Sequence, residues 1–125
     1  MVRVVGLDHI VLRTTDVERS LTFYCDQLGL DPERVEEWRR GEVLFPSVRV
    51  DATTLIDLFA GERDGANLDH LCLVVEPTDL QALAESLEPG REGNAVFEGL
   101  YGAQGFASSI YVHDPDGNVV ELRSY

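Results

Sequence analysis

Hydrophobic and polar residues follow two different patterns in the first third of the chain. Val4–Leu12 is almost continuously apolar and rich in Val, Leu and Ile, which predicts a strand buried on both faces. Thr15 and Glu18 then have the spacing of a helix capping box, and apolar positions recur at helical intervals until Gly29. The pattern therefore predicts a strand followed by a helix over Asp16–Leu28.

Short extended runs follow this helix. They are separated by turn-forming residues and predict an antiparallel meander of three strands over Val35–Arg39, Val43–Val50 and Thr54–Phe59. Residues 61–67 contain Gly and Asp and have the composition of a linker. The first half of the chain is thus predicted to be one strand, one helix and three strands.

The same order of elements returns after the linker. Leu68–Leu73 repeats the Leu-Asp-His opening of Leu7–Leu12, and Thr78 with Gln81 repeats the capping box before a helix over Asp79–Leu87. Three further strands are predicted at Ala95–Tyr101, Ser108–His113 and Val119–Tyr125. The chain is therefore expected to be a single domain of two βαβββ modules, over residues 4–60 and 68–125.

Each predicted module carries a histidine in its first strand and a carboxylate in its last. These residues are His9 and Asp57 in the first copy, and His70 and Glu121 in the second. A lone histidine in an apolar strand is more often a hydrogen-bonded core residue than a metal ligand. A buried carboxylate, however, needs a cation or strong donors. The matched positions in both copies favour one shared metal ion.

The best ligand set is His9, His70 and Glu121. Two histidines and one carboxylate suit divalent Fe, Mn, Ni, Co or Zn, and three protein ligands leave open positions for substrate oxygens or water. Asp57 is a fourth candidate that would bind the metal directly, act through a water or serve as a base. An Asp at the end of a strand beside a Gly-rich linker is also often only a turn acceptor.

Three other side chains are candidates for a substrate pocket. Arg123 lies two residues after Glu121 on the same strand and so shares its face, where it could hold a carboxylate or phosphate. Tyr111 is a candidate pocket wall or acid–base residue, and Arg49 lies in the third predicted strand. Solvated strand-end arginines and plain packing of the tyrosine are the alternatives.

The segment Gly99–Phe106 has three glycines and two aromatic residues between predicted strands. It is expected to be either a mobile lid over a substrate or an ordinary loop, because gating loops often combine flexible hinges with apolar cover.

Composition narrows the range of partners. The 125 residues carry 10 Lys+Arg, all of them arginine, against 23 Asp+Glu, so the net charge of −13 repels phosphate backbones and excludes nucleic acid as a partner. There is no apolar run long enough to span a membrane and no signal peptide, which predicts a cytoplasmic protein with no membrane partner. Cys25 and Cys72 have no metal or redox spacing and are expected to be buried thiols.

The double repeat, its two Leu-Asp-His openings and the closing segment Asp114–Leu122 together resemble the vicinal oxygen chelate superfamily, the glyoxalase/bleomycin-resistance/dioxygenase group. The resemblance implies an α+β fold in which the two βαβββ modules form an incomplete barrel around the site. It also implies a homodimer, with ligands from one chain or two. The family's metal ligands fall on His9, His70 and Glu121. Glyoxalases carry a Glu at the position of Asp57, whereas the His-His-Glu set is similar to that of extradiol dioxygenases and fosfomycin-modifying members.

The resemblance implies a small metalloenzyme whose ion chelates neighbouring oxygens of a small-molecule substrate. Lyase or isomerase chemistry needs a base, for which Glu121 and Asp57 are the candidates, whereas ring cleavage needs Fe(II). The alternatives are a non-catalytic protein that binds a small molecule or antibiotic, and a fosfomycin-type epoxide-opening enzyme. The absence of lysine disfavours the last of these, since a phosphonate needs a cationic pocket.

Overall fold

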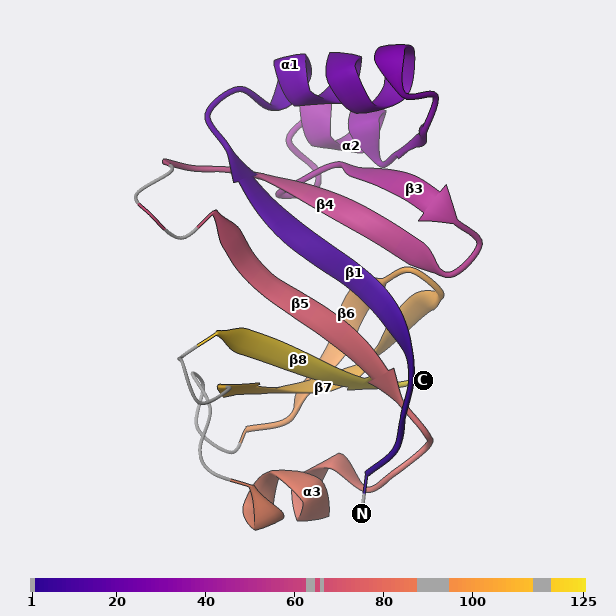
Figure 1. Ribbon diagram of the computed structural model, residues 1–125, viewed down its shortest axis with the longest axis vertical. Helices are drawn as coiled ribbons and strands as arrows, with labels where there is room; N and C mark the ends of the chain where they lie inside the picture. Colours follow the sequence, from indigo (N-terminus) through magenta and orange to yellow (C-terminus); the bar gives the residue numbers. More distant parts are fainter. Residues whose placement is uncertain (1, 63–64, 66, 88–94, 114–117) are drawn as a thin grey trace. The chain divides into compact units, whose positions relative to one another are not determined.

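The computed structural model describes residues 2–62, 65, 67–87, 95–113 and 118–125 (Figure 1). The chain divides into two compact units, one of Ile10–Asp69 and the other of Met1–His9 with His70–Tyr125. Strands β1 (Val4–Thr14) and β5 (Leu68–Val75) contribute residues to both units. Among the described residues, no helix has the length and apolar character to cross a membrane.

The element order confirms the predicted α+β fold built from two βαβββ modules. The first module has one additional short helix between its second and third strands. In chain order it contains β1, α1 (Val17–Leu21), the π-helical segment η1 (Thr22–Gln27), β2 (Asp31–Glu33), α2 (Val35–Arg39), β3 (Ser47–Asp51) and β4 (Thr54–Ala60). The second contains β5, α3 (Leu80–Ser86), β6 (Phe97–Gly102), β7 (Gly105–His113) and β8 (Val119–Ser124).

In the unit of residues 10–69, the strand order is β2-β3-β4-β1. Helices α1 and α2 lie together beside strands β3 and β4 (Figure 1). Val17 and Leu21 of α1 pack on Val48 and Leu58 of the strands, and Trp38 of α2 packs against the same cluster. The apolar face of each helix is thus buried on the sheet, as expected for short amphipathic helices.

The segment Val35–Arg39 is helix α2, so its prediction as a strand is wrong. Val35 and Trp38 are three residues apart and both pack on the same core cluster, which is helical and not strand spacing. Arg39 also pairs with Glu36 at 2.8 Å, one helical turn away. The short strand β2, which the pattern did not predict, takes the place of the missing strand in the module.

Both capping boxes are displaced by one residue from their predicted positions. The N-caps are Asp16 and Asp79, not Thr15 and Thr78, and each aspartate side chain accepts the backbone N–H three residues further on. An aspartate is as good an N-cap as a threonine, and its charge also favours the positive end of the helix. The same displacement in both copies shows that the repeat preserves the helix start.

Two other predicted boundaries also differ. The single helix predicted over Asp16–Leu28 is divided into α1 and η1, and the N–H of Leu28 donates to the carbonyl of Phe23, a π-helical interval. The strand predicted from Val43 begins only at Ser47. The preceding residue is a proline, which has no N–H to donate to a neighbouring strand.

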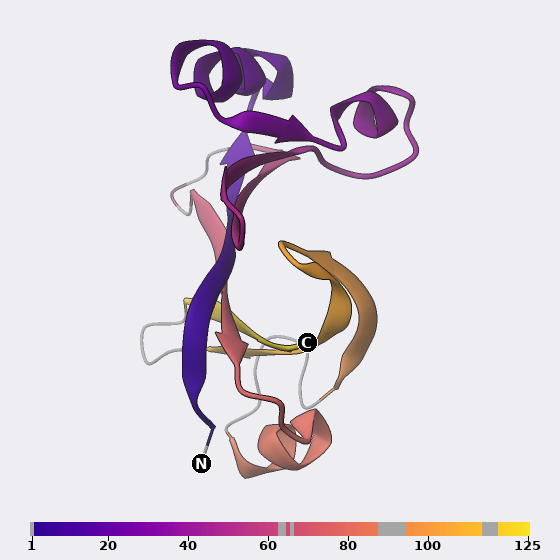
Figure 2. The ribbon, with the colours of Figure 1, turned by 90° about the vertical axis from the view of Figure 1, so that its right-hand side faces the viewer.

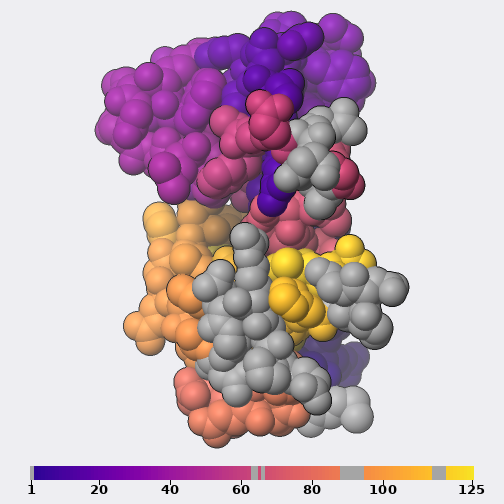
Figure 3. Space-filling model, turned by 90° about the vertical axis from the view of Figure 1, so that its left-hand side faces the viewer, coloured from indigo at the N-terminus to yellow at the C-terminus, as the bar shows by residue number. Residues whose placement is uncertain are grey.

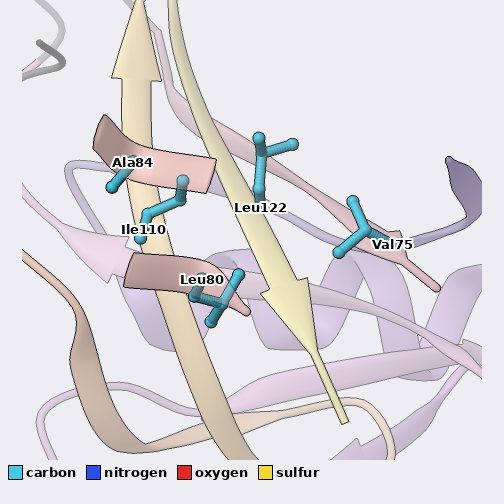
Figure 4. Packing of buried hydrophobic residues seen from close by; sticks show 5 residues of the cluster. All are labelled: Val75, Leu80, Ala84, Ile110 and Leu122. Atoms are coloured by element: carbon cyan, nitrogen blue, oxygen red, sulfur yellow. The ribbon is translucent and has the colours of Figure 1, made fainter. Parts of the chain in front are cut away.

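In the other unit, the strand order is β1-β5-β8-β7-β6. Strand β8 pairs in parallel with β5 and antiparallel with β7. Helix α3 contacts strand β7. On the face shown in Figure 3, the salmon atoms of this helix lie next to the orange atoms of the strands that follow it in the chain. The core between them is built from Val75, Leu80, Ala84, Ile110 and Leu122 (Figure 4).

The opposite face of the same strands is polar. Register places both Tyr111 and Cys72 opposite Glu121, and Ser109 opposite Arg123. Because side chains alternate between the two faces of a strand, these residues lie on the side away from the apolar core. The sheet of this unit therefore separates a packing face from a face rich in ionisable groups.

The segment Gly99–Phe106 is the tip of the β6–β7 hairpin, so its prediction as an ordinary loop between strands is wrong, whereas its role as a lid stays a prediction. Gly102 pairs with Gly105 across the turn, and the hairpin curls strongly along its length (Figure 2). Gly105 has a φ of 104°, a conformation that favours glycine. Residues 114–117 of the predicted closing turn, and 63, 64 and 66 of the predicted linker, lie outside the described residues.

Candidate metal centre

Three predicted ligands converge within the unit of residues 1–9 and 70–125. The Nε2 atoms of His9 and His70 lie 3.3 and 3.1 Å from the same oxygen, Oε2 of Glu121. One ligand atom from each of the three residues lies within 4.8 Å of the other two. The two imidazole rings meet edge to face, with centroids 5.5 Å apart. His9 and Glu121 are buried and His70 is partly exposed, so the cluster is reached from the His70 side.

Strand pairing explains how β5 and β8 supply two of these groups. Cys72 lies opposite Glu121 in the parallel β5–β8 pair, and His70 precedes Cys72 by two residues. His70 and Cys72 therefore share a face, and both lie on the side of the sheet that carries Glu121. The parallel pairing of β5 and β8 therefore holds His70 and Glu121 side by side, and both residues belong to strands and not to a loop.

Asp8 orients the imidazole of His9. Its Oδ2 lies 2.7 Å from Nδ1 of His9, and the same carboxylate accepts the backbone N–H of Ala103 at 2.9 Å and the hydroxyl of Tyr125. Burial alone would raise the pKa of Asp8, but the hydrogen bonds from His9, Tyr125 and Ala103 outweigh it and lower the pKa. An ionised carboxylate at Nδ1 keeps the proton there and leaves Nε2 as the ligand atom.

The donor set fits a divalent cation. His9 has one ring nitrogen against Asp8 and the other against Glu121, yet a neutral imidazole has only one N–H to donate. A cation beside Oε2 would satisfy both Nε2 lone pairs and the carboxylate together. Two donor atoms bound at about 2.1 Å and at roughly a right angle lie about 3 Å apart. The distances within the cluster match that separation.

The second oxygen of Glu121 is held by the protein. Oε1 accepts the hydroxyl of Ser109 at 2.7 Å and the Nη1–H of Arg123 at 3.1 Å. Burial alone would raise the pKa of Glu121, but the hydrogen bonds from His70, His9 and Ser109 outweigh it and hold the pKa well below its usual range. Glu121 is therefore an anion at neutral pH, as a metal ligand must be.

Arg123 has no exposed surface. Besides Glu121, its guanidinium donates to the carbonyl oxygens of Leu100 and Gly105, and its Nε lies 3.9 Å from Oδ1 of Asp8. It also lies over the ring of Tyr125, with Cζ 5.0 Å from the centroid. The structure thus places Arg123, which was predicted to line a substrate pocket, next to the two buried carboxylates of the site, Asp8 and Glu121.

The other predicted residues are placed as follows. Tyr111 is partly exposed, and its ring meets those of His70 and Phe97 edge to face at 5.7 Å each, so these aromatic groups line up beside the ligand cluster. Arg49 belongs to the unit of residues 10–69, where it pairs with Glu33.

Asp57 lies in that same unit. It is 2% exposed and accepts the hydroxyl of Ser47 at 2.6 Å. Its predicted roles as ligand, base or water-bound group stay predictions.

The sequence pattern did not single out Asp8 or Tyr125. For Asp8 a signal is present, because an aspartate precedes the histidine in both copies of the repeat. For Tyr125 there is none, since a tyrosine near a chain end has no periodic partner.

Cys72 is the remaining buried group at this site. Its thiol, together with Asp8 and His9, forms a second set within ligand distance. Burial raises the pKa of Cys72 to about 12. Without a bound metal, this thiol therefore stays protonated and is a poor nucleophile.

Comparisons with known proteins find similar sequences and similar folds. The chain is 29% identical over 122 residues to a probable lactoylglutathione lyase of Synechocystis sp., covering 91% of each chain. Its fold is similar to that of methylmalonyl-CoA epimerase from Mycobacterium tuberculosis, with a TM-score of 0.60 and 18% identity, covering 97% of this chain and 88% of the epimerase. It is also similar to the 2,3-dioxygenase LapB from Pseudomonas sp. KL28, with a TM-score of 0.64 and 17% identity, covering 98% of this chain and 41% of LapB.

A family model gives the assignment. Residues 6–122 match the model of the Glyoxalase/Bleomycin resistance protein/Dioxygenase superfamily, which spans both modules and all three converging side chains. The chain belongs to the Glyoxalase/Bleomycin resistance protein/Dioxygenase superfamily.

Proposed function

We propose that this protein is a metal-dependent enzyme in which His9, His70 and Glu121 hold a divalent ion that binds two neighbouring oxygens of a small-molecule substrate. The observation that carries the proposal is the convergence of two histidine nitrogens on one carboxylate oxygen, while the other nitrogen of His9 is occupied by Asp8. Three protein ligands leave coordination positions for substrate.

A bound ion of this kind supplies Lewis-acid stabilisation of negative charge on a substrate oxygen. The protein's own residues supply the arrangement around it. Asp8 fixes the ring orientation of His9, and Ser109 fixes the carboxylate of Glu121. The edge of Tyr111 beside His70 offers an apolar surface for the carbon skeleton of the substrate.

Lyase or isomerase chemistry is the reaction class we favour. It is supported by the similarity to a probable lactoylglutathione lyase along 91% of both chains. Such chemistry needs a base, and Glu121 is already engaged as a ligand in the proposed metal site. Of the two predicted carboxylates, Asp57 is therefore the better candidate base.

Ring-cleaving dioxygenase chemistry is the second candidate. It is supported by the donor set itself, since two histidines and one carboxylate with open positions are typical of non-haem Fe(II) oxygenases. The dioxygenase LapB has a similar fold, although this chain covers only 41% of its length.

We further propose a homodimer in the cytoplasm, on the strength of the family resemblance and the pattern of the sequence. The small-molecule substrate is the partner that the site is built for. A non-catalytic protein that binds a small molecule through the same fold is the alternative, and metal analysis separates the two.

The test is elemental analysis by mass spectrometry of protein purified anaerobically without chelator. The wild-type chain, Glu121→Gln and His113→Ala are compared, because His113 is an exposed histidine at the end of β7 and serves as the matched control. We expect about one metal per chain in the wild type and in His113→Ala, and none in Glu121→Gln.

The identity of the metal then directs the assays. Iron leads to catechol-type substrates and oxygen uptake, whereas Ni, Co, Zn or Mn leads to lyase and isomerase substrates. If no ion binds to the wild type, even after incubation with each metal in turn, the proposal is wrong and the non-catalytic alternative takes its place.

A further inference from the structure

We propose that Arg123 and Ser109 are positioning residues that reserve one oxygen of Glu121, so that Glu121 binds the metal through its other oxygen alone. This inference rests on the proposed metal function of the cluster. It adds a statement about coordination number: a carboxylate that binds through both oxygens takes up one more position on the ion than a carboxylate that binds through one.

The two oxygens of Glu121 have separate partners. Oε1 accepts two hydrogen bonds, from Ser109 at 2.7 Å and from Arg123 at 3.1 Å. Oε2 faces only the ligand nitrogens, those of His9 and His70, among the contacts found in the described part of the chain. Rotation of the carboxylate to offer both oxygens to a metal would break a hydrogen bond to a buried cation, which is costly.

Arg123 is itself fixed in place. Its guanidinium is buried and donates to two backbone carbonyls of the β6–β7 hairpin, those of Leu100 and Gly105. Gly102 of the same hairpin lies directly against it, where an added Cβ would come within 2.4 Å of Cζ of Arg123. The hairpin thus leaves a space that fits the guanidinium only because residue 102 has no side chain.

The charges give a reason for this arrangement. Asp8 and Glu121 are both buried carboxylates, and the guanidinium of Arg123 lies within 3.9 Å of each. A buried guanidinium is expensive to desolvate unless several acceptors satisfy it. Such a residue is unexplained as packing alone, but it is explained as the group that fixes the carboxylate through which the metal binds.

The test uses Co(II) as a probe, because its visible absorption weakens as coordination number rises. Arg123→Met, Ser109→Ala and Gly102→Ala are compared with the wild type and with Arg39→Met, the matched control from the other unit, where Arg39 pairs with Glu18 and Glu36. Co(II) affinity is measured by competition with a chromogenic chelator. Unfolding of the metal-free proteins is followed in parallel.

We expect Arg123→Met to bind Co(II) about 10-fold more weakly and with a weaker visible spectrum. Gly102→Ala is expected to change the spectrum in the same direction, because it displaces the guanidinium without touching Glu121, and Ser109→Ala to change it less. Arg39→Met should leave both readouts at their wild-type values.

A lower melting temperature of the three variants with an unchanged Co(II) spectrum would overturn the inference and leave Arg123 a purely structural residue. If Arg123→Met does not fold, Ser109→Ala and Gly102→Ala decide the question, because they retain the buried cation. Failure of the wild type to bind Co(II) is a different result, since it removes the proposed metal function itself.

Discussion

The last strands of the two modules, β4 and β8, hold their carboxylates in related but different ways. Each carries a buried acidic residue that accepts a serine hydroxyl from the neighbouring strand, at 2.6 Å for Asp57 and 2.7 Å for Glu121. In the first module, the serine, Ser47, is directly opposite its aspartate. In the second, Ser109 lies opposite Arg123, so the glutamate reaches it diagonally. The extra methylene of Glu makes that reach feasible and turns Oε2 toward the histidines.

The residue two positions after each carboxylate differs more sharply. On β4 it is Phe59, which is 38% exposed, whereas on β8 it is Arg123, which is fully buried. The repeat therefore preserves a serine–carboxylate pair, and one strand adds a buried cation to it. The two modules thus share a scaffold and differ in the residue that follows the carboxylate by two positions.

The largest expected difference between the two modules concerns metal binding, and it is tested by removing the charge of each carboxylate in turn. Glu121→Gln should abolish tight metal binding, because an amide replaces the anionic ligand. Asp57→Asn should keep the metal, as expected of a base and not of a ligand. Metal content per chain is the measurement, and loss of metal in Asp57→Asn would make Asp57 a fourth ligand.

Exchanging the residues that follow the two carboxylates by two positions, Phe59 and Arg123, should change the free energy of unfolding by different amounts. Arg123→Phe leaves two buried carboxylates without their cation and should lower the free energy of unfolding by about 3–5 kcal/mol. Phe59→Arg changes a partly exposed side chain and should cost less than about 1 kcal/mol. Urea denaturation of the metal-free proteins measures both, and equal losses would show that Arg123 has no special electrostatic role.

Activity should separate the two carboxylates once a substrate is known. If Asp57 is the base, Asp57→Asn should lower kcat by about 100-fold at unchanged metal content. Arg39→Met, a change in the same unit at a residue that pairs with Glu18 and Glu36, is the control for general disturbance of that unit. A variant with wild-type kcat would exclude Asp57 as the base and return that role to Glu121.

Removing the serine hydroxyls that bind the two carboxylates should have the smallest effect on stability. Ser109→Ala and Ser47→Ala each remove one hydrogen bond to a buried carboxylate, and each should cost about 1–3 kcal/mol of stability. For Ser109→Ala the loss should lie at the lower end of this range, because Arg123 still donates to Glu121. Thermal unfolding measures the loss, and a value at the upper end for Ser109→Ala would contradict the compensating role of Arg123.

Much of the fold follows from the periodic part of the sequence. The two strand–helix–three-strand modules and the meeting of His9, His70 and Glu121 could be predicted because the repeat places similar groups at similar positions. Helix α2 could not, since two apolar residues in a segment of five, Val35 and Trp38, are too few to define a period, and the helix depends on their packing against the cluster that contains Leu21 and Val48.

The surroundings of the ligands were less predictable. A strand-end arginine is ordinarily solvated, so nothing in the pattern indicates that Arg123 is buried between Asp8 and Glu121. The burial depends on Gly102, which reaches Arg123 only after the β6–β7 hairpin curls. Such a contact is a property of the folded sheet and not of local spacing.

The two cysteines have a practical consequence for measuring motion at the site. Cys72 is fully buried opposite Glu121, whereas Cys25 is partly exposed on η1. A thiol-modifying reagent can reach Cys72 only when the groups that cover it, among them Asp8 and His9, move away, so the rate of its modification reports how often the site opens. Cys25 provides an internal standard in the same sample, without any label being engineered. A bound ion that ties β5 to β8 should slow the modification of Cys72 and leave that of Cys25 unchanged.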